Sequence, residues 1–287
     1  MSELTFHLIN GFVWGSIIAL VALGLSLVFG LAEIMNLAHG ELYMLGAVAS
    51  IFIISWINSF WLAIIVVPLF IGVLGLIIER FILRRIEKDP PATLIATFGL
   101  SMIIQYLILW WFGGAPRRVS DPIGFTFSLG ESYYPLYRIF VAIISVIFFI
   151  GFNFFISRTR YGLWIRGVGQ DPELAASLGV PISKIYWITF GFGSALAAIA
   201  GVMMAPIVAV EFKMGSDIIV LAFMASIIGG LGNIKGTFLA SLFVGVLESL
   251  LALPFSPTFA RVGVLVVVCA TLVFRPEGLL FKREIIT

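Results

Sequence analysis

The chain has 287 residues, of which 61% are hydrophobic and only 11% are charged. An ordinary soluble domain is about 25% charged, so this composition excludes a soluble globular protein. The net charge of +2 is too small to indicate a nucleic-acid partner. The lone cysteine, Cys269, excludes an internal disulfide and disfavours a thiolate metal site.

Apolar runs of roughly 18 or more residues recur along the chain, and each predicts a membrane-spanning helix. The first run lacks the flanks of a signal peptide, so we expect it to be retained. The expected fold is an all-α polytopic membrane protein, one domain over residues 1–287, with about nine (8–10) transmembrane helices. The predicted spans are 8–32, 37–57, 60–79, 93–112, 137–157, 185–207, 217–232, 236–253 and 259–274. The second, seventh and eighth adjoin polar or glycine-rich breaks, so partly re-entrant helices are an alternative there.

The loops between these spans differ in their content of lysine and arginine. Most of these residues fall in one alternating set of loops, namely Arg80, Arg84, Arg85, Lys88, Arg158, Arg160, Arg166, Lys184, Lys235, Arg275, Lys282 and Arg283. The other set holds Arg117, Arg118, Arg138, Lys213 and Arg261. Cytoplasmic loops are enriched in positive charge. The prediction is a multi-pass protein of a plasma membrane, with the N-terminus outside and the C-terminus in the cytoplasm.

The polar loop 113–137, which is expected to be external, is too rich in proline and glycine to span the membrane. The basic loop from Ser157 to Lys184 contains the pattern of a short helix in GQDPELAASLGVP. Asp171 suits the N-cap, Pro172 the first helical position, and Gly179 the left-handed turn that ends a helix. A helix this short is marginal alone in water, so we expect it to pack against another surface.

The segment GLAEIMNLAHGELYMLGA interrupts the first apolar region with carboxylates and an imidazole. One interpretation is a polar turn at the cytoplasmic surface. The other places part of the break inside the helix bundle, lining a path, because ionisable groups at membrane depth face the bundle interior or water. A second internal carboxylate, Glu248, is expected about midway along its span, without evident partners. The path or gate candidates are Glu33, Asn36, His39, Glu41 and Glu248. Gln105 and Asn153 are expected to form hydrogen bonds between helices.

A similar order of features recurs in the second half of the chain. The segment GVMMAPIVAVEFKMGSDIIVLAFMA again has an apolar run, a charged break and an apolar run. The loop charges give the two segments opposite directions across the membrane, which is the pattern of an inverted repeat. The second break then lies near an outer mouth, with Glu211, Lys213 and Asp217 as candidate residues.

The sequence lacks the motifs of several enzyme classes. GGLGNIKGT resembles a phosphate-binding loop, but its glycine spacing is wrong and glycine follows the lysine. The two histidines in the chain exclude a multi-histidine metal or haem site. We therefore expect a protein that is not an enzyme, binds no ATP by itself, and has no cofactor, no metal and no catalytic residue.

Four ordered blocks resemble a known family. LGLSLVFGLAEIMNLAHGELYMLGA, RGVGQDPELAASLGVPISKIYWITFGFGSALAAIAG, IIGGLGNIKGTFLAS and FRPEGLL are similar to the permease subunits of branched-chain amino-acid ATP-binding-cassette importers (the LivH type). The resemblance implies a translocation path for branched-chain, hydrophobic amino acids in a prokaryotic inner membrane. It implies as partners a second related permease, two cytoplasmic ATPase subunits and an external solute-binding protein.

The resemblance also maps the family's ATPase-coupling helix onto the capped helix in the basic loop. The residues expected there are Asp171, Pro172, Glu173, Leu174, Ala175, Leu178 and Gly179, with Leu174, Ala175 and Leu178 forming an apolar patch. Two alternatives stay open. The chain could be a urea or short-amide permease of the same family, or a secondary transporter coupled to an ion at its internal carboxylates.

Overall fold

The structure, a computed structural model, describes residues 3–32, 34–86, 89–129 and 132–274. Glu33, Lys88, the C-terminal Arg275, Lys282 and Arg283, and most of the FRPEGLL block lie outside the described residues.

Most of the described chain is helical. Eight helices there are long and apolar enough to cross a membrane. They are α1 (Glu3–Ala32), α2 (His39–Ile57), α3 (Phe60–Phe81) with the 3-10 turn η1 (Leu83–Arg85), α4 (Pro90–Phe112), α5 (Leu136–Arg158), α8 (Ile182–Met204), α10 (Ile234–Leu251) and α11 (Pro257–Phe274). The prediction of an all-α polytopic membrane protein is confirmed.

The helix α9 (Met214–Gly229) departs from the predicted spans. It has 16 residues, which at 1.5 Å per residue gives about 24 Å, less than the roughly 30 Å of the apolar layer. The seventh predicted span, 217–232, was therefore wrong as a full crossing, while each of the other eight coincides with a long helix.

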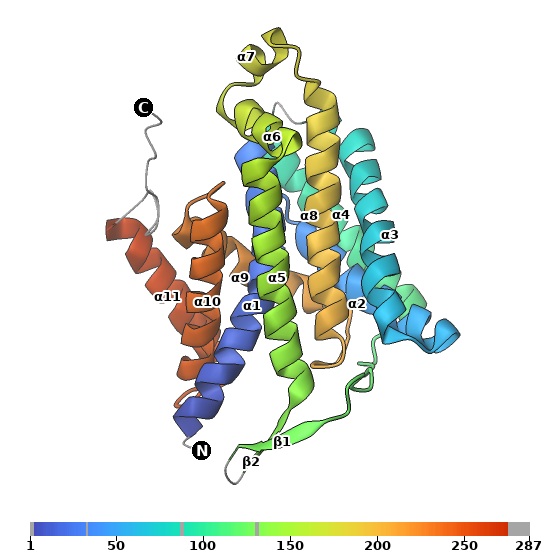
Figure 1. The fold of residues 1–287 in the computed structure, drawn as a ribbon, viewed down its shortest axis with the longest axis vertical. Coiled ribbons are helices and arrows are strands. Elements are labelled where there is room, and N and C mark those ends of the chain that lie inside the picture. The colour runs from blue at the N-terminus through green and yellow to red at the C-terminus, as the bar shows by residue number, and fades with distance from the viewer. Residues whose placement is uncertain (1–2, 33, 87–88, 130–131, 275–287) are drawn as a thin grey trace.

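The two ends of the bundle carry different structures (Figure 1). At one end, here called the α7 end, lie α6 (Arg160–Gln170) and α7 (Pro172–Ser177). At the opposite end, here called the hairpin end, the predicted outer loop forms an antiparallel hairpin of β1 (Thr126–Leu129) and β2 (Ser132–Pro135). The N-terminus lies at the hairpin end, and α8 runs back from the α7 end.

The helix α1 lies at the centre of the bundle, where it packs on α10, α8, α9 and α5. It approaches α10 closely because glycines face each other across the contact. A Cβ placed on Gly11 would lie 2.7 Å from the Val246 Cα, and one on Gly15 would lie 2.8 Å from the Leu242 Cα. Small residues that let backbones approach are a common basis of helix packing in membranes.

The helices α2 and α9 both begin inside the bundle. A Cβ on Gly24 of α1 would lie 2.8 Å from the His39 Nε2 at the start of α2. Since α1 continues to Ala32, eight residues further, α2 begins about 12 Å inside the end of α1. The backbones of Gly40 and Gly215 are in contact, so α9 begins at the same place. From there α2 runs toward the hairpin end and α9 toward the α7 end.

The contacts between helices repeat in two halves of the chain. The pairs α1–α10, α1–α9, α2–α3 and α2–α4 have as counterparts α8–α3, α8–α2, α9–α10 and α9–α11. Exchanging α1 to α4 with α8 to α11 converts each pair into its counterpart. A Cβ on Gly24 would meet the Gly193 carbonyl oxygen, and a Cβ on Gly193 would meet the Gly24 carbonyl oxygen. Gly40 and Gly215 face each other in the same way, as expected for equivalent residues beside a two-fold axis. This is the arrangement that an inverted repeat predicts.

Replacing Gly245 tests the close packing of α10 on α1. A Cβ there would lie 2.7 Å from the Gly11 carbonyl oxygen and closer still to the Gly15 backbone. We expect Gly245→Ala to destabilise the protein by about 1–3 kcal/mol, because neither backbone can yield locally. Gly151 of α5 has nothing within 4 Å of its Cβ position. Gly151→Ala should therefore be neutral or stabilising. Thermal unfolding in detergent measures both, and equal shifts would contradict the packing.

Candidate functional site

The polar break between α1 and α2 lies inside the bundle. Asn36, His39 and Glu41 are each at most 2% exposed. The interpretation as a polar turn at the surface is therefore wrong for these three residues, and the interpretation as part of the bundle interior is confirmed. The chain folds back after α1 and re-enters the helix bundle before α2 begins. Glu33 lies outside the described residues.

Polar side chains of α4 hold this fold-back in place. Thr97 accepts a hydrogen bond from the Leu37 amide (3.3 Å), and its hydroxyl donor is shared between the Met35 and Leu94 carbonyls, both at 3.1 Å. One and two turns further along α4, Ser101 and Gln105 follow at the four-residue spacing that places side chains on one helix face. The side chains of Thr97, Ser101 and Gln105 are here called the α4 stripe.

The α4 stripe meets the carboxylate of Glu41. Ser101 Oγ donates to Glu41 Oε1 at 2.9 Å, and Gln105 Nε2 donates to the same oxygen at 2.7 Å. Gln105 Nε2 also lies 2.7 Å from Ser216 Oγ in the first turn of α9. One glutamine amide thus connects α4, α2 and α9, which confirms Gln105 as a hydrogen bonder between helices.

Several buried polar atoms at the fold-back have no hydrogen-bond partner within the described residues. They are Asn36 Oδ1, His39 Nε2 and Glu41 Oε2. Unpaired buried polar atoms are rare in proteins, and each one indicates strain, a ligand or a water. The cluster can therefore accept hydrogen bonds from a passing solute or from water.

Thr97, Ser101 and Ser216 were not among the candidates from the sequence. A serine or threonine in an apolar helix usually bonds to its own backbone, so it gives little signal alone. The signal that could have found them is the regular spacing of Thr97, Ser101 and Gln105 in one apolar helix.

Glu248 belongs to a second polar group, near the hairpin end. It lies three residues before the end of α10, which corrects the expectation of a position midway along the span. Its two oxygens accept hydrogen bonds from Trp14 Nε1 at 2.7 Å and from Arg261 Nε at 3.1 Å. Arg261 also forms an ion pair with Asp217 at 3.2 Å. Glu248 thus has the partners that the sequence did not reveal.

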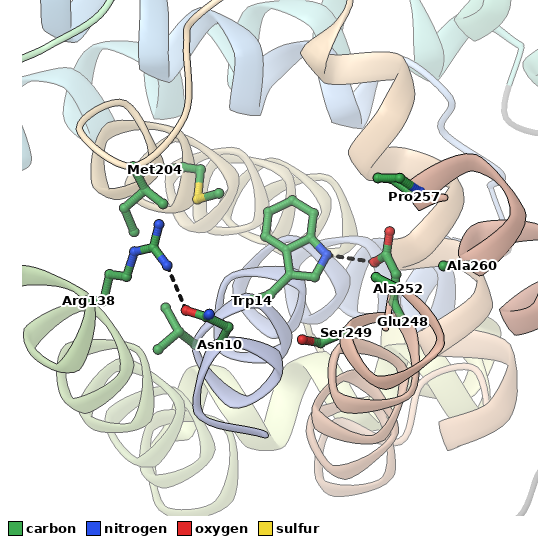
Figure 2. A pocket seen from close by; sticks show the side chains of 11 residues that line it. Asn10, Trp14, Arg138, Met204, Glu248, Ser249, Ala252, Pro257 and Ala260 are labelled. Atoms are coloured by element: carbon green, nitrogen blue, oxygen red, sulfur yellow. Dashed lines mark hydrogen bonds between the residues drawn. The ribbon is translucent and has the colours of Figure 1, made fainter. Parts of the chain in front are cut away.

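Beside Glu248 lies a cavity of about 260 Å³ between α1, α5, α10, α11 and the end of α8. Figure 2 shows Arg138 and Glu248 on opposite sides of it, with Trp14 between them. Arg138 donates to Asn10 Oδ1 at 2.6 Å. The remaining lining is mostly apolar, from Val13, Met204, Ile207, Ala252, Pro257 and Ala260.

The three residues predicted at an outer mouth lie just before α9 or in its first turn. Lys213 and Asp217 are exposed, whereas Glu211 is half-buried. The strand-like segment before them is tied to the hairpin end by a bridge between Arg117 and Val210. Of the three, Asp217 is joined to Glu248 through Arg261.

The capped helix in the basic loop forms as predicted. Asp171 Oδ1 accepts a hydrogen bond from the Leu174 amide at 2.9 Å, and Pro172 is the first residue of α7. The helix ends at Ser177, and Gly179 in the turn that follows has a φ of +81°. The amide of Val180 bonds to the Ala175 carbonyl, which is the pattern of a glycine-ended helix.

The predicted apolar patch on α7 needs one correction. Leu174 and Leu178 are 58% and 76% exposed, but Ala175 is only 5% exposed and belongs to the core of the protein. Ala175 faces inward because α7 packs on α6 and α8. The exposed patch is therefore Leu174 and Leu178, flanked by the exposed Pro172 and Glu173. The helix α6 was not predicted.

The fold thus defines a polytopic membrane protein with a polar fold-back at its centre and a short capped helix projecting from one end. The family model described as branched-chain amino acid transport system / permease component matches residues 7–273. The chain belongs to this family.

Relatives cover nearly the whole chain. The high-affinity branched-chain amino acid transport system permease protein BraD of Pseudomonas aeruginosa is 29% identical, over 97% of this chain and 96% of the relative. The permease proteins LivH of Salmonella typhimurium and Escherichia coli K12 are each 28% identical over the same shares. No solved structure gives a significant match.

Substitutions at Glu248 and Asp217 test the polar group at the hairpin end. Glu248→Leu leaves the Trp14 N–H and part of Arg261 without an acceptor, so we expect a loss of about 1–3 kcal/mol in stability. Asp217→Asn removes an exposed ion pair and should cost less than about 1 kcal/mol. Thermal unfolding of the purified chain compares the two. A larger effect of Asp217→Asn would contradict this assignment.

Proposed function

We propose that the chain forms the translocation path of an ATP-binding-cassette importer for branched-chain, hydrophobic amino acids. The family membership and the full-length relatives support the role of a permease subunit. The names of those relatives support the substrate class. The chain itself is not an enzyme in this proposal, and ATP hydrolysis takes place on partner subunits.

The proposed assembly contains a second related permease, two ATPase subunits and an external solute-binding protein. In this proposal the α7 end is cytoplasmic, because cytoplasmic segments are enriched in positive charge. The ends of α3 and α5, the turn η1 and the helix α6 lie there and carry Arg80, Arg84, Arg85, Arg158, Arg160 and Arg166. The N-terminus is then outside and the C-terminus inside a prokaryotic plasma membrane. The hairpin end faces the solute-binding protein, with Glu211, Lys213 and Asp217 at the outer mouth.

The observation that carries the proposal is the exposed patch on α7. A six-residue helix with a proline start, a capped N-terminus and a glycine end is well defined locally. Its two leucines nevertheless project into solvent at the basic end of the molecule. Exposed apolar side chains that fill a pocket on a partner commonly supply much of the binding energy. We assign the ATPase subunit as that partner.

The fold-back supplies the wall of the path in this proposal. Irregular backbone at membrane depth occurs where it lines a cavity or is buried in protein. Broken helices that meet near the midplane are the usual basis of solute sites in transporters. The starts of α2 and α9, with Asn36, His39 and Glu41, fit this description. Glu248 lies further along the path toward the hairpin end.

Substitution of both exposed leucines tests the assignment of α7. We expect the double variant Leu174→Asp, Leu178→Asp to weaken binding of the ATPase subunit by about 2 kcal/mol or more, roughly thirtyfold, and to abolish uptake. Asp171→Ala should act more mildly, since a lost N-cap costs about 1 kcal/mol. Co-purification of tagged permease with the ATPase measures the effect.

The control for this experiment is Leu253→Asp, which makes the same change at an exposed leucine after α10, at the hairpin end. It should leave co-purification unchanged. Normal co-purification of the α7 double variant would show that α7 is an ordinary connector. Ala175 is unsuitable for this test, because a bulky charge there would disrupt the protein's own packing.

The energy source and the solute are tested in proteoliposomes that contain the complete complex. We expect uptake of L-leucine, L-isoleucine or L-valine to require ATP and the solute-binding protein. Uptake driven by an ion gradient without ATP would instead indicate a secondary transporter. ATP-dependent uptake of urea or short amides, with no uptake of branched-chain amino acids, would assign the chain to the other substrate class.

A further inference from the structure

The two oxygens of the Glu41 carboxylate have different surroundings. Oε1 accepts hydrogen bonds from Ser101 and Gln105, whereas Oε2 has no partner among the described residues. A Cβ on Gly215 would lie 2.5 Å from Oε2, so this oxygen lies against the first turn of α9. The side chain is fully buried. A carboxylate can accept about four hydrogen bonds, so Glu41 has unused acceptor capacity at the point where α2 and α9 begin.

The donors that Glu41 has come from a loosely attached helix. The buried residues of α4 over its first three turns are Thr93, Thr97 and Ser101, and apolar burial resumes only near its end, at Ile108 and Phe112. Most of the other side chains of α4 face away from the bundle. Helices with little buried apolar surface are the ones that move at low cost in free energy. The helix α4 can therefore separate from Glu41 more readily than any part of α1 or α8.

We propose that Glu41 binds the positively charged ammonium group of the transported solute, and that Ser101 and Gln105 occupy this position while the path is closed. The inference rests on the proposed function and deepens it. The Ser101 hydroxyl and the Gln105 amide present an O–H and an N–H donor to Oε1, much as an ammonium group would present its N–H donors. An ammonium group carries a full positive charge, so its attraction to the carboxylate includes a Coulombic contribution that the neutral donors of Ser101 and Gln105 lack. An α-amino acid can therefore displace the α4 stripe from Glu41.

The contact between Gly40 and Gly215 closes the path beside this carboxylate. Each lacks a side chain, and a Cβ on Gly215 would meet both the Gly40 carbonyl oxygen and the carboxylate. Gln105 bonds both Glu41 of α2 and Ser216 of α9, so its displacement from Oε1 also lets α2 and α9 separate and makes Oε2 accessible to the same ammonium group.

Glu41→Gln tests the charge alone. Its amide oxygen can still accept from Ser101 and Gln105, so the closed arrangement is retained, while the negative charge is lost. In proteoliposomes with the complete complex, we expect ATP-dependent uptake of L-leucine to fall about tenfold or more. The matched control is Glu79→Gln, since Glu79 is an equally buried carboxylate on α3 outside the site. The complex with Glu79→Gln should take up L-leucine at the rate of the unmodified complex.

The outcomes separate this inference from the proposed function. If the unmodified complex takes up no L-leucine with ATP, the proposed function fails and this inference fails with it. If the unmodified complex takes up L-leucine and Glu41→Gln does so at the same rate, this inference alone is overturned.

A second measurement does not depend on the folding of Glu41→Gln. Ser101→Cys, made in a Cys269→Ser chain, is treated with a water-soluble thiol reagent during ATP turnover of the complex. We expect L-leucine to speed the labelling, because its ammonium group displaces residue 101 from Glu41, and 4-methylpentanoate, which lacks the ammonium group, to leave it unchanged. Ser145→Cys on α5 is the control, because Ser145 is also buried in the resting protein and lies outside the site. Labelling of Ser101→Cys that is independent of L-leucine would overturn the inference.

Discussion

Polar groups in the apolar interior of a membrane bundle need partners from the protein itself, because no solvent reaches them. This constraint acts most strongly where the chain leaves α1 and folds back. The free carbonyl of Met35 and amide of Leu37 are paired by Thr97, and the carboxylate of Glu41 is paired by the next two residues of the α4 stripe. Polar contacts therefore hold the first half of α4 in the bundle, whereas apolar contacts of Ile108 and Phe112 hold its end.

The same fold-back determines how closely the central helices pack. Backbone segments that re-enter a bundle need space, and glycines supply it where Gly24 faces Gly193 and Gly40 faces Gly215. These contacts lie where the two halves of the chain meet, so backbone packs directly on backbone there, among buried side chains such as His39 and Ile219.

The two functional regions of the molecule have different kinds of stability. The helix α7 is bounded by local contacts, namely a cap at Asp171 and a left-handed turn at Gly179. The cluster around Glu41 is stabilised by contacts between distant segments, such as the hydrogen bond from Gln105 to Ser216. In the function proposed above, α6 and α8, on which α7 packs, connect α7 to the rest of the bundle.

Local patterns determined much of this protein from the sequence alone. Long apolar runs predicted the spans, and the caps of α7 were read correctly because they depend on residues three or four positions apart. The helix α6 was missed because three of its eleven residues are glycines, which are poor helix formers.

Only the tertiary structure decided the depth of each polar residue. The break at Asn36 to Glu41 fitted a surface turn and a bundle interior equally well, because the sequence does not say where a chain folds back. The partners of Glu41 lie 60 and 64 residues away on α4, and those of Glu248 lie on α1 and α11, so no local pattern could reveal them. The inward orientation of Ala175 likewise depends on α6. Hydrogen bonds and packing between distant segments decided these features, since their free energy depends on the assembled bundle.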